Sequence, residues 1–534
     1  MAECFSVMDP TGLWNEIHRA PLSPRPDDLR GKTLFVIDTW QKNSGFDEFE
    51  PRLLAALTAK YPGLKIERRL RGGYAADEQP LWDEVREKAD AFLYFGVPSC
   101  TPVTYAMTWA ARRLEAAGVP GAVIFHAYFE EAALTAREKE GVRVRYIPVP
   151  YPCDSLAEDT CEALFAQVES ALTAPLTEEE LCSGPYTPAP PPRISMTGSF
   201  EEIQTYFYEK GWTDGLPIVP PTEDRVAAML TGTSHAAEEL VCTDMAPEGY
   251  RVTVEKAAVI AVMAGALPAY FPVILAGIEL LGSGAFHATA KSTNSFSYMQ
   301  VVNGPIRKEL EMGDGICALG AGNRANAVIG RALRLALICL GGTKPGVTLM
   351  GVQGNVSTFS FAFAENEESS PWTPLSAEAG FGPEDSTLSI FSGGWSHRGN
   401  YLFDPGLGRV MSAVACFEYC SGFTILMSPK RAKDLAEAGY DTREKIEEYL
   451  WQLCHRSKGE FIRNGHFERQ FLRVINSGHG PYPREWLDLP EDALLPMVPK
   501  NEIRVVVVGD PNGTNVMQAW NMYHPKTISI DRWR

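Results

Sequence analysis

From Gly31 to Leu172 the chain alternates between short apolar runs and longer amphipathic runs, and this alternation restricts the fold more than any other feature. Apolar runs of five or six residues bounded by glycine, proline or polar residues are typical of buried strands, and longer amphipathic runs are typical of helices. The expected strands are 33–38, 64–69, 91–95, 121–126 and 143–148, and the expected helices are 46–60, 80–88, 103–117, 130–140 and 157–172. Such alternation predicts an α/β fold with a doubly wound parallel sheet of the flavodoxin or Rossmann kind.

The chain divides into two α/β units joined by a proline-rich segment. We expect an N-terminal arm at 1–30, a first unit at 31–176, a linker at 177–193 and a larger second unit at 194–534. The linker passes from an acidic run into Pro-Tyr-Thr-Pro-Ala-Pro-Pro-Pro, a stiff composition that typically separates domains. The second unit repeats strand, glycine-rich turn and helix patterns, which indicates a second α/β domain with room for two subdomains.

Two apolar stretches define the core of the second unit. The longer one, 257–281, is divided by Gly265, Pro268 and Pro272, so we expect two helices buried in a soluble core rather than one membrane span. This helix pair is apolar enough to serve at a subunit interface, and we therefore expect a homo-oligomer. The second stretch, 503–508, predicts a strand that leads through a glycine-containing turn into a helix.

The overall charge restricts the class of partner. The formal net charge is −18 and no run rich in lysine or arginine is present, which argues against nucleic acid or an anionic membrane as partner. The partner that remains is a small-molecule substrate, and an anionic one needs local basic residues. Eleven cysteines without paired metal-finger spacing, together with an N-terminal arm lacking a continuous apolar segment, predict a cytoplasmic protein with free thiols.

Cys100 is the strongest candidate for chemistry. It follows the expected strand 91–95, after Gly96 and Pro98 break that strand and before the expected helix begins. Ser99 or Thr101 can cap the helix, so the thiol lies where unpaired amide N–H groups and the positive end of the helix dipole converge, and such a position lowers the pKa of a thiol. The alternative is a small, inert residue packed in a βα turn.

Other loops are expected at the same edge of the sheet, because ligands bind outside the carboxyl ends of parallel strands. His126 ends the fourth strand and can orient or deprotonate a thiol, although a histidine packed under a loop without a chemical role is the alternative. The catalytic candidates are thus Cys100, His126 and Ser99. Asp38 and Thr39 end the first strand and are candidates for binding substrate.

The second unit supplies further candidates for holding a substrate. Asp214 lies in a loop dense in glycine and proline, and Asn303 ends a short strand. A glycine-rich turn at 320–326 carries Arg324 and Asn326 into a helix, which is a natural site for an anion. The alternatives are a plain helix entry for this turn and a domain brace for the loop of Asp214. The leading interpretation places these residues and Cys100 around one cleft between the two units.

A metal-centred interpretation uses other residues of the second unit. His287 lies in a polar loop, Cys317 in a glycine-flanked segment and Glu365 in an acidic cluster after an apolar strand. These are ligand types for a transition metal, and they would support a metal-dependent lyase, hydratase or oxidoreductase. In the leading interpretation no cofactor is required.

Three segments of the first unit resemble a known family. The segments 95–101 (FGVPSCT), 114–120 (LEAAGVP) and 146–152 (YIPVPYP) resemble the UGSC family of (seleno)proteins, which is similar to the substrate-activating selenoprotein component of glycine and betaine reductases. The resemblance covers roughly 31–175. The portion from about 196 onward resembles an uncharacterised companion domain, through the segments 212–217 (WTDGLP), 302–305 (VNGP) and 384–387 (EDST).

The resemblance carries one departure. The family motif is a selenocysteine or cysteine followed by Gly-Ser-Cys, and its last two residues fall on Ser99 and Cys100, whereas its first two fall on Val97 and Pro98. A two-thiol redox pair inside the motif is therefore absent. Either Cys100 acts alone as nucleophile or one-thiol redox centre, or its redox partner comes from elsewhere, or the redox role of the family is lost here. A further interpretation is a non-catalytic subunit of a reductase complex, in which Cys100 only carries a substrate.

Overall fold

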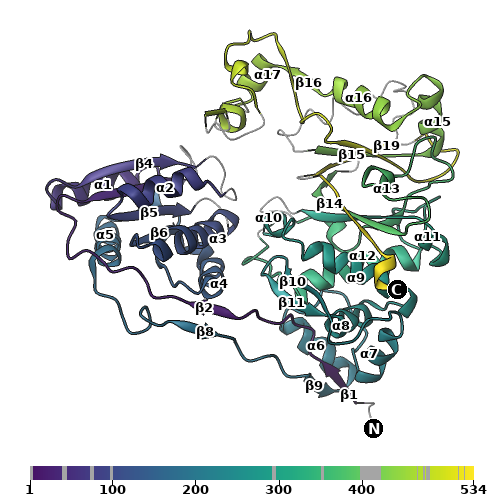
Figure 1. Ribbon diagram of the computed structural model, residues 1–534, viewed down its shortest axis with the longest axis horizontal. Coiled ribbons are helices and arrows are strands. Elements are labelled where there is room, and N and C mark those ends of the chain that lie inside the picture. Colours follow the sequence, from purple (N-terminus) through teal and green to yellow (C-terminus); the bar gives the residue numbers. More distant parts are fainter. Residues whose placement is uncertain are drawn as a thin grey trace.

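The computed structural model has an α/β fold, as the sequence predicts. It describes residues 4–38, 45–71, 77–96, 100–291, 296–349, 351, 354–396, 422–465, 467–472, 475–476, 482–514, 516–521 and 524–534. The first unit lies at one end of the longest axis, and the second unit occupies the rest (Figure 1).

The first unit is built on one parallel sheet of five strands. The strands are β3 (Thr33–Asp38), β4 (Lys65–Leu70), β5 (Ala91–Gly96), β6 (Gly121–His126) and β7 (Arg145–Val149). Their order is β4-β3-β5-β6-β7, and all neighbours are parallel. The doubly wound sheet expected from the alternating pattern is confirmed. Because the order changes direction between β3 and β5, the carboxyl ends of these two strands form the topological switch point where ligands bind in such sheets.

Helices cover both faces of this sheet, which explains why its central strands are continuous apolar runs. Alternate side chains of β5 and β6, among them Phe95 and Ile124, pack with α1 (Phe49–Lys60) and α5 (Glu158–Thr173). The intervening side chains pack on the opposite face with three other helices, which are α2 (Gln79–Lys88), α3 (Cys100–Trp109) and α4 (Glu130–Glu140).

The N-terminal arm and the segment 184–198 run side by side between the units and form two short antiparallel strand pairs. Strand β1 (Phe5–Met8) pairs antiparallel with β9 (Ile194–Gly198), and β2 (Ile17–Arg19) pairs antiparallel with β8 (Gly184–Tyr186). The arm thus runs beside the linker across the gap between the units (Figure 1). Val7 is fully buried in the core of the second unit, so the arm begins in one unit and ends in the other.

The second unit contains a mixed sheet of seven strands. The strands are β12 (Ser297–Asn303), β13 (Ala362–Ala364), β14 (Thr387–Ser396), β15 (Gly422–Met427), β18 (Ile503–Val507), β19 (Val516–Asn521) and β20 (Lys526–Ser529). Their order is β13-β12-β14-β19-β15-β18, with β20 on β14. The prediction of a helix after the turn at 509–515 is wrong. Residues 516–521 are strand β19, because pairing with β14 on one side and β15 on the other satisfies this backbone.

The apolar helices of the second unit are buried, as expected. They are α8 (Val254–Ala264) and α9 (Phe271–Leu281), and they pack with α12 (Arg324–Cys339) in one large core. This core uses the apolar surface of the pair, so a subunit interface at these helices has no support and the homo-oligomer stays a prediction. Within the described ranges, no helix has both the length and the apolar character that a membrane span requires.

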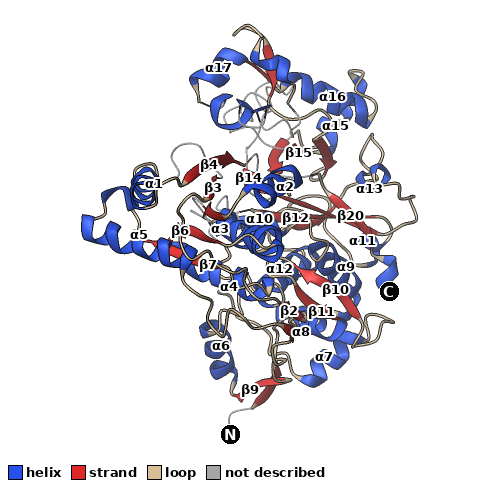
Figure 2. Ribbon diagram, turned by 60° about the vertical axis from the view of Figure 1, so that its left-hand side comes forward, coloured by secondary structure: helices blue, strands red, loops and turns tan. Residues whose placement is uncertain are grey.

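The other elements of the second unit surround this core and the mixed sheet. They are α6 (Phe200–Glu209), α7 (Glu223–Leu230), β10 (Leu240–Met245), β11 (Tyr250–Thr253), α10 (His287–Ala290), α11 (Ile306–Glu309), α13 (Leu375–Glu378), α15 (Pro429–Glu437), α16 (Arg443–Leu453), β16 (His455–Ser457), α17 (Lys458–Arg463) and β17 (Leu494–Pro496). Among them, α10 lies beside α3 of the first unit in both views (Figure 1, Figure 2).

Charged side chains join the two units along α4. Lys139 of the first unit forms an ion pair with Glu248 of the second, and its ammonium group lies 5.1 Å from the ring centroid of Tyr250. Lys291 approaches the same Glu248 carboxylate at 3.1 Å. Lys344 pairs with Glu131 at a more exposed point. A buried carboxylate shared by two lysines is therefore the centre of the contact between the units.

Candidate functional site

Cys100 lies where the sequence places it along the chain. Strand β5 ends at Gly96 and helix α3 begins at Cys100, so the cysteine stands at the helix N-terminus beside the switch point of the sheet. The positive end of the helix dipole lies there. Residues 97–99, including Ser99, lie outside the described residues, and so does the side chain of Cys100.

Asp38 lies in a charged cluster at the same edge. It ends β3 in register with Phe95 of β5, and its carboxylate lies 3.5 Å from the guanidinium of Arg68 on β4. Arg68 also pairs with Glu50 from the first turn of α1. Two carboxyl groups thus share one arginine at the switch point. Thr39, the other residue expected here, lies outside the described residues.

Both carboxyl groups of this cluster titrate near neutral pH. Burial raises the pKa of Asp38 to about 6, although Arg68 opposes the shift. Burial raises the pKa of Glu50 to about 7, and the charge of Asp38 adds to this shift. Carboxyl groups with such pKa values can accept and donate protons at physiological pH. Glu50 was not among the residues predicted from the sequence, where its one signal is a carboxylate on the buried side of α1 beside Phe49.

His126 packs among aromatic rings at the end of β6. Its imidazole stacks on Phe46 with the ring centroids 4.4 Å apart, and it meets Tyr151 edge to face at 5.0 Å. The alternation of side chains along β6 places His126 on the face covered by α1 and α5, whereas α3 covers the other face. The aromatic contacts favour a packing role for His126. Its expected action on the thiol of Cys100 stays a prediction.

A buried arginine stands on the α3 side of the edge. Arg71 follows β4, is fully buried, and donates a hydrogen bond to the hydroxyl of Tyr94 at 2.6 Å. Its guanidinium lies 4.8 Å from the ring centroid of Trp82 and 3.4 Å from Glu78. Each face of the sheet therefore carries one arginine at this edge, Arg68 with its two carboxyl partners on one face and Arg71 with Glu78 on the other.

Three of the polar residues expected to bind substrate make hydrogen bonds within the second unit. Asp214 accepts two hydrogen bonds from Arg331 at 2.8 and 3.0 Å, which fastens its loop to α12. Asn326 donates to the carbonyls of 313 and 318 at 2.9 and 3.1 Å. Asn303 is fully buried and donates to Glu365 at 2.7 Å. These contacts use the carboxylate of Asp214 and both ends of the Asn326 amide, whereas Oδ1 of Asn303 accepts no hydrogen bond from the described residues.

Arg324 keeps an exposed position at the first residue of α12. Its guanidinium donates to the carbonyl of Gly265 at 3.2 Å, within the second unit. The glycine-rich turn before it is a helix entry, capped by the side chain of Asn323 on the backbone N–H of Asn326. A shared cleft for Arg324 and Cys100 stays a prediction.

The three expected metal ligands are not brought together. His287 lies 3.3 Å from Asp244, Cys317 is exposed in a loop with a φ of 58°, and Glu365 is enclosed by Asn303 and Arg443. Across the residues that the structure describes, no group of three or more histidine, cysteine, aspartate and glutamate side chains could hold a metal ion. His287 and Glu365 have structural partners instead, whereas Cys317 is a free, exposed thiol.

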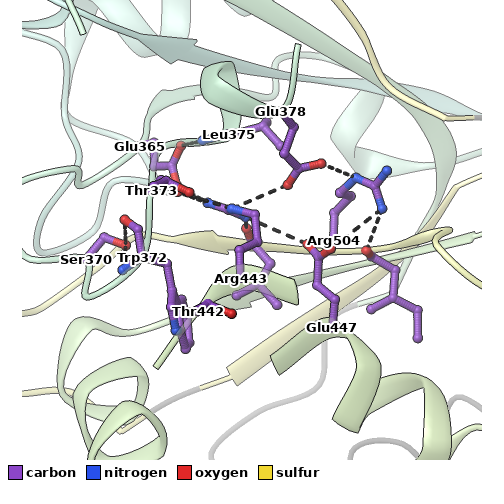
Figure 3. A network of polar contacts seen from close by, with 12 residues as sticks. Glu365, Ser370, Trp372, Thr373, Leu375, Glu378, Thr442, Arg443, Glu447 and Arg504 are labelled. Carbon is purple, nitrogen blue, oxygen red and sulfur yellow. Dashed lines mark hydrogen bonds and ion pairs between the residues drawn. The ribbon is translucent and has the colours of Figure 1, made fainter. Parts of the chain in front are cut away.

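Glu365 belongs to a buried network of charges, shown in Figure 3. Arg443 lies 3.3 Å from Glu365 and 3.3 Å from Glu378, and Arg504 lies 2.7 Å from Glu378. Both arginines stand 3.9 Å from Glu447, whose pKa burial raises to about 8. Because these side chains come from separate elements, the network joins α13, α16 and β18 and explains the burial of Glu365 without a metal.

The comparison with known families concerns the N-terminal part of the chain. The model of the UGSC family matches residues 6–178, which includes most of the arm, the parallel sheet and Cys100. No curated protein matches the chain. The match agrees with the resemblance of the segment around Cys100 and does not extend to the second unit. Residues 6–178 are therefore similar to the UGSC family.

Proposed function

We propose that the protein is an enzyme that acts on a small anionic organic molecule through the thiolate of Cys100. In this proposal the thiolate is a nucleophile or a one-thiol redox centre, in a lyase or oxidoreductase reaction that breaks or forms a C–S, C–N or related bond. The observation that carries the proposal is the position of Cys100 at the first residue of α3, beside the switch point of a UGSC-family sheet.

The carboxyl pair lies on the α1 side of the switch point and adds acid–base groups to the edge of the sheet where α3 begins. A thiol must lose its proton to attack, and the product of attack often needs a proton to leave. Asp38 and Glu50, with pKa values raised to about 6 and about 7, are suited to both transfers near neutral pH. Their arginine partner Arg68 has a half-exposed side chain that an anionic substrate can reach.

The setting proposed for this activity is the cytoplasm. All eight cysteines whose side chains the structure describes are free thiols, which supports a reducing compartment. A small-molecule partner fits a formal charge of −18 better than a nucleic acid does.

Limited alkylation with iodoacetamide tests the proposal without knowledge of the substrate. We expect Cys100 to be labelled faster at pH 7 than Cys182 and Cys317, which are exposed cysteines elsewhere. The pH at which half-maximal labelling rate is reached should lie below the roughly 8.5 of a free cysteine, because the helix N-terminus stabilises the thiolate. Mass spectrometry of peptides assigns each rate to its residue.

Cys100→Ser and Cys182→Ser form a matched pair for this experiment. The first variant should lose the fast labelling event and the second should keep it. Labelling of Cys100 at the rate of Cys182, with a midpoint near 8.5, would remove the basis of the proposal.

A further inference from the structure

The second unit contains a small cavity, lined by both polar and apolar side chains, that none of the expected sites uses. It lies between α12, the start of β12 and the segment 357–361, and its volume is about 20 Å³. That volume exceeds the 10–15 Å³ or so needed for one water molecule and is too small for a whole substrate. The lining residues that carry the argument are Ser297, Tyr298, Gln300 and Arg334.

Two side chains of β12 bring buried polar atoms to this cavity. Ser297 and Gln300 are 1% and 2% exposed, and both line the cavity. Neither Ser297 Oγ nor Gln300 Oε1 has a hydrogen-bond partner among the described residues. Because a buried polar atom without a partner costs free energy, two of them at one cavity indicate a place for a polar ligand.

Arg334 gives this cavity its charge. Its guanidinium forms no ion pair or hydrogen bond with any residue in the described part of the chain, and burial lowers its pKa. The nearby carboxylate of Asp214 is already bound by Arg331. No aspartate or glutamate is among the described residues that line the cavity, although the whole chain has an excess of acidic residues. The cavity thus presents an uncompensated positive charge.

The cavity also has a connection toward the first unit. The hydroxyl of Tyr298 lies 3.1 Å from the hydroxyl of Thr289 in α10. Helix α10 lies beside α3, the helix that begins at Cys100, in both views (Figure 1, Figure 2). The cavity therefore borders the side of the second unit that faces the first.

We propose that Arg334, Ser297 and Gln300 bind the carboxylate group of a small organic acid. The guanidinium can donate two parallel hydrogen bonds to a carboxylate, and the serine hydroxyl can donate a third. The amide of Gln300 can turn its NH2 group toward the same anion, since its two ends are interchangeable in shape. The size of the cavity restricts it to one such group, so the rest of the molecule extends outside. That this acid is the substrate of Cys100 rests on the proposed function, whereas the binding itself does not.

Binding of acetate to the full chain tests this site, with acetamide as the neutral probe of the same shape. Both are added at constant ionic strength, and the unfolding temperature and the heat of binding are measured. We expect acetate, and not acetamide, to raise the unfolding temperature of the wild type, because a ligand that binds only the folded state stabilises it. Arg334→Gln should weaken acetate binding at least tenfold, and Arg334→Lys less, because it keeps the charge.

The control variant is Arg484→Gln, which removes an exposed arginine elsewhere and should leave acetate binding unchanged. Ser297→Ala is the second variant and should weaken acetate binding severalfold. It tests the site even if Arg334→Gln fails to fold. An equal effect of acetate and acetamide on the wild type, or unchanged acetate binding in both Arg334→Gln and Ser297→Ala, would overturn the site.

The same titration in Cys100→Ser separates this inference from the proposed function. Acetate binding should be unchanged there, because the carboxylate site contains no thiol. If acetate binds through Arg334 while Cys100 proves unreactive toward iodoacetamide, the carboxylate site stands and the thiol-dependent function fails. If Cys100 is reactive and acetate does not bind, the thiol-dependent function stands and the carboxylate site fails.

Discussion

At the scale of single residues, burial determines which polar groups of this protein can change charge near neutral pH. Asp38, Glu50 and Glu447 have raised pKa values because each carboxylate has lost much of its hydration, and the arginines beside them only partly compensate. Asp38 and Glu50 stand beside the switch point, whereas Glu447 belongs to the network of Figure 3. Burial thus raises the pKa values of two candidate acid–base groups in the first unit and of one carboxyl group in a structural network of the second unit.

Glu50→Gln should change how stability depends on pH. The pKa of Glu50 is raised to about 7 in the folded state, so its contribution to stability is complete below about pH 4.5 and is lost as the pH rises through 7. The wild type should therefore lose more stability between pH 5 and pH 8 than the variant, by roughly 1–3 kcal/mol. Urea unfolding of the first unit at both pH values measures the difference. Glu162→Gln, at an exposed position of α5, is the control, and equal losses in all three proteins would contradict this cause.

Gly45→Ala tests the close packing around His126. Gly45 has a φ of +80°, and a Cβ atom there would lie 2.7 Å from Nε2 of His126. Gly118 has a φ of +94° with nothing within 4 Å of a Cβ, so Gly118→Ala isolates the backbone cost of roughly 1 kcal/mol. We expect Gly45→Ala to lose at least about 1 kcal/mol more than this control in chemical unfolding. Equal losses would show that the loop can move away from the imidazole.

At the scale of elements, the sequence predicted the first unit well and the second less well. Strands β3, β5 and β6 are continuous apolar runs buried on both faces, so their composition alone identifies them. Strand β19 was missed because neighbours distant in the sequence hold it on both sides. The position of Cys100 at a helix start followed from local pattern. The burial of Arg334 and Glu50 could not be predicted from local pattern, because an arginine or a glutamate in an amphipathic helix has no sequence signal for burial.

The loop that contains Asp214 depends on one ion pair with α12. The Asp214 side chain is 2% exposed and Arg331 is 18% exposed, so removing the carboxylate leaves a largely buried charge without its partner. Asp214→Ala should destabilise the second unit by roughly 3–5 kcal/mol. Asp434→Ala removes an exposed pair with Lys430 and should cost about 0.5 kcal/mol or less. Thermal unfolding of both variants checks the contrast, and a similar small effect in both would mean that the loop is held by other contacts.

At the scale of the whole molecule, the described residues of the two units contact each other through charge, and their buried apolar residues form separate cores. Glu248 lies between Lys139 and Lys291, and burial lowers the pKa of Lys139 well below its usual value. Such a contact is specific, because the carboxylate neutralises two ammonium groups that would otherwise repel each other.

Glu248→Ala should therefore separate the two units. Without the carboxylate, Lys139 and Lys291 face each other and repel, so we expect an increase in the radius of gyration from small-angle X-ray scattering and faster hydrogen exchange in α4. Lys344→Ala removes the more exposed pair with Glu131 and should leave both measurements near those of the wild type. An unchanged radius and exchange rate in Glu248→Ala would show that the connecting strands alone hold the units in place.

The pairing of β1 with β9 makes the first unit an insertion within the second. Strand β1 belongs to the second unit, the chain after it builds the parallel sheet, and the β1–β9 pair is complete only when residues 194–198 are available. During synthesis on the ribosome, Phe5–Met8 have no partner strand until about 190 more residues are added. The parallel sheet can fold completely in that interval, whereas the core around Val7 cannot close. The order of synthesis therefore favours folding of the first unit, which contains Cys100, before the second unit folds.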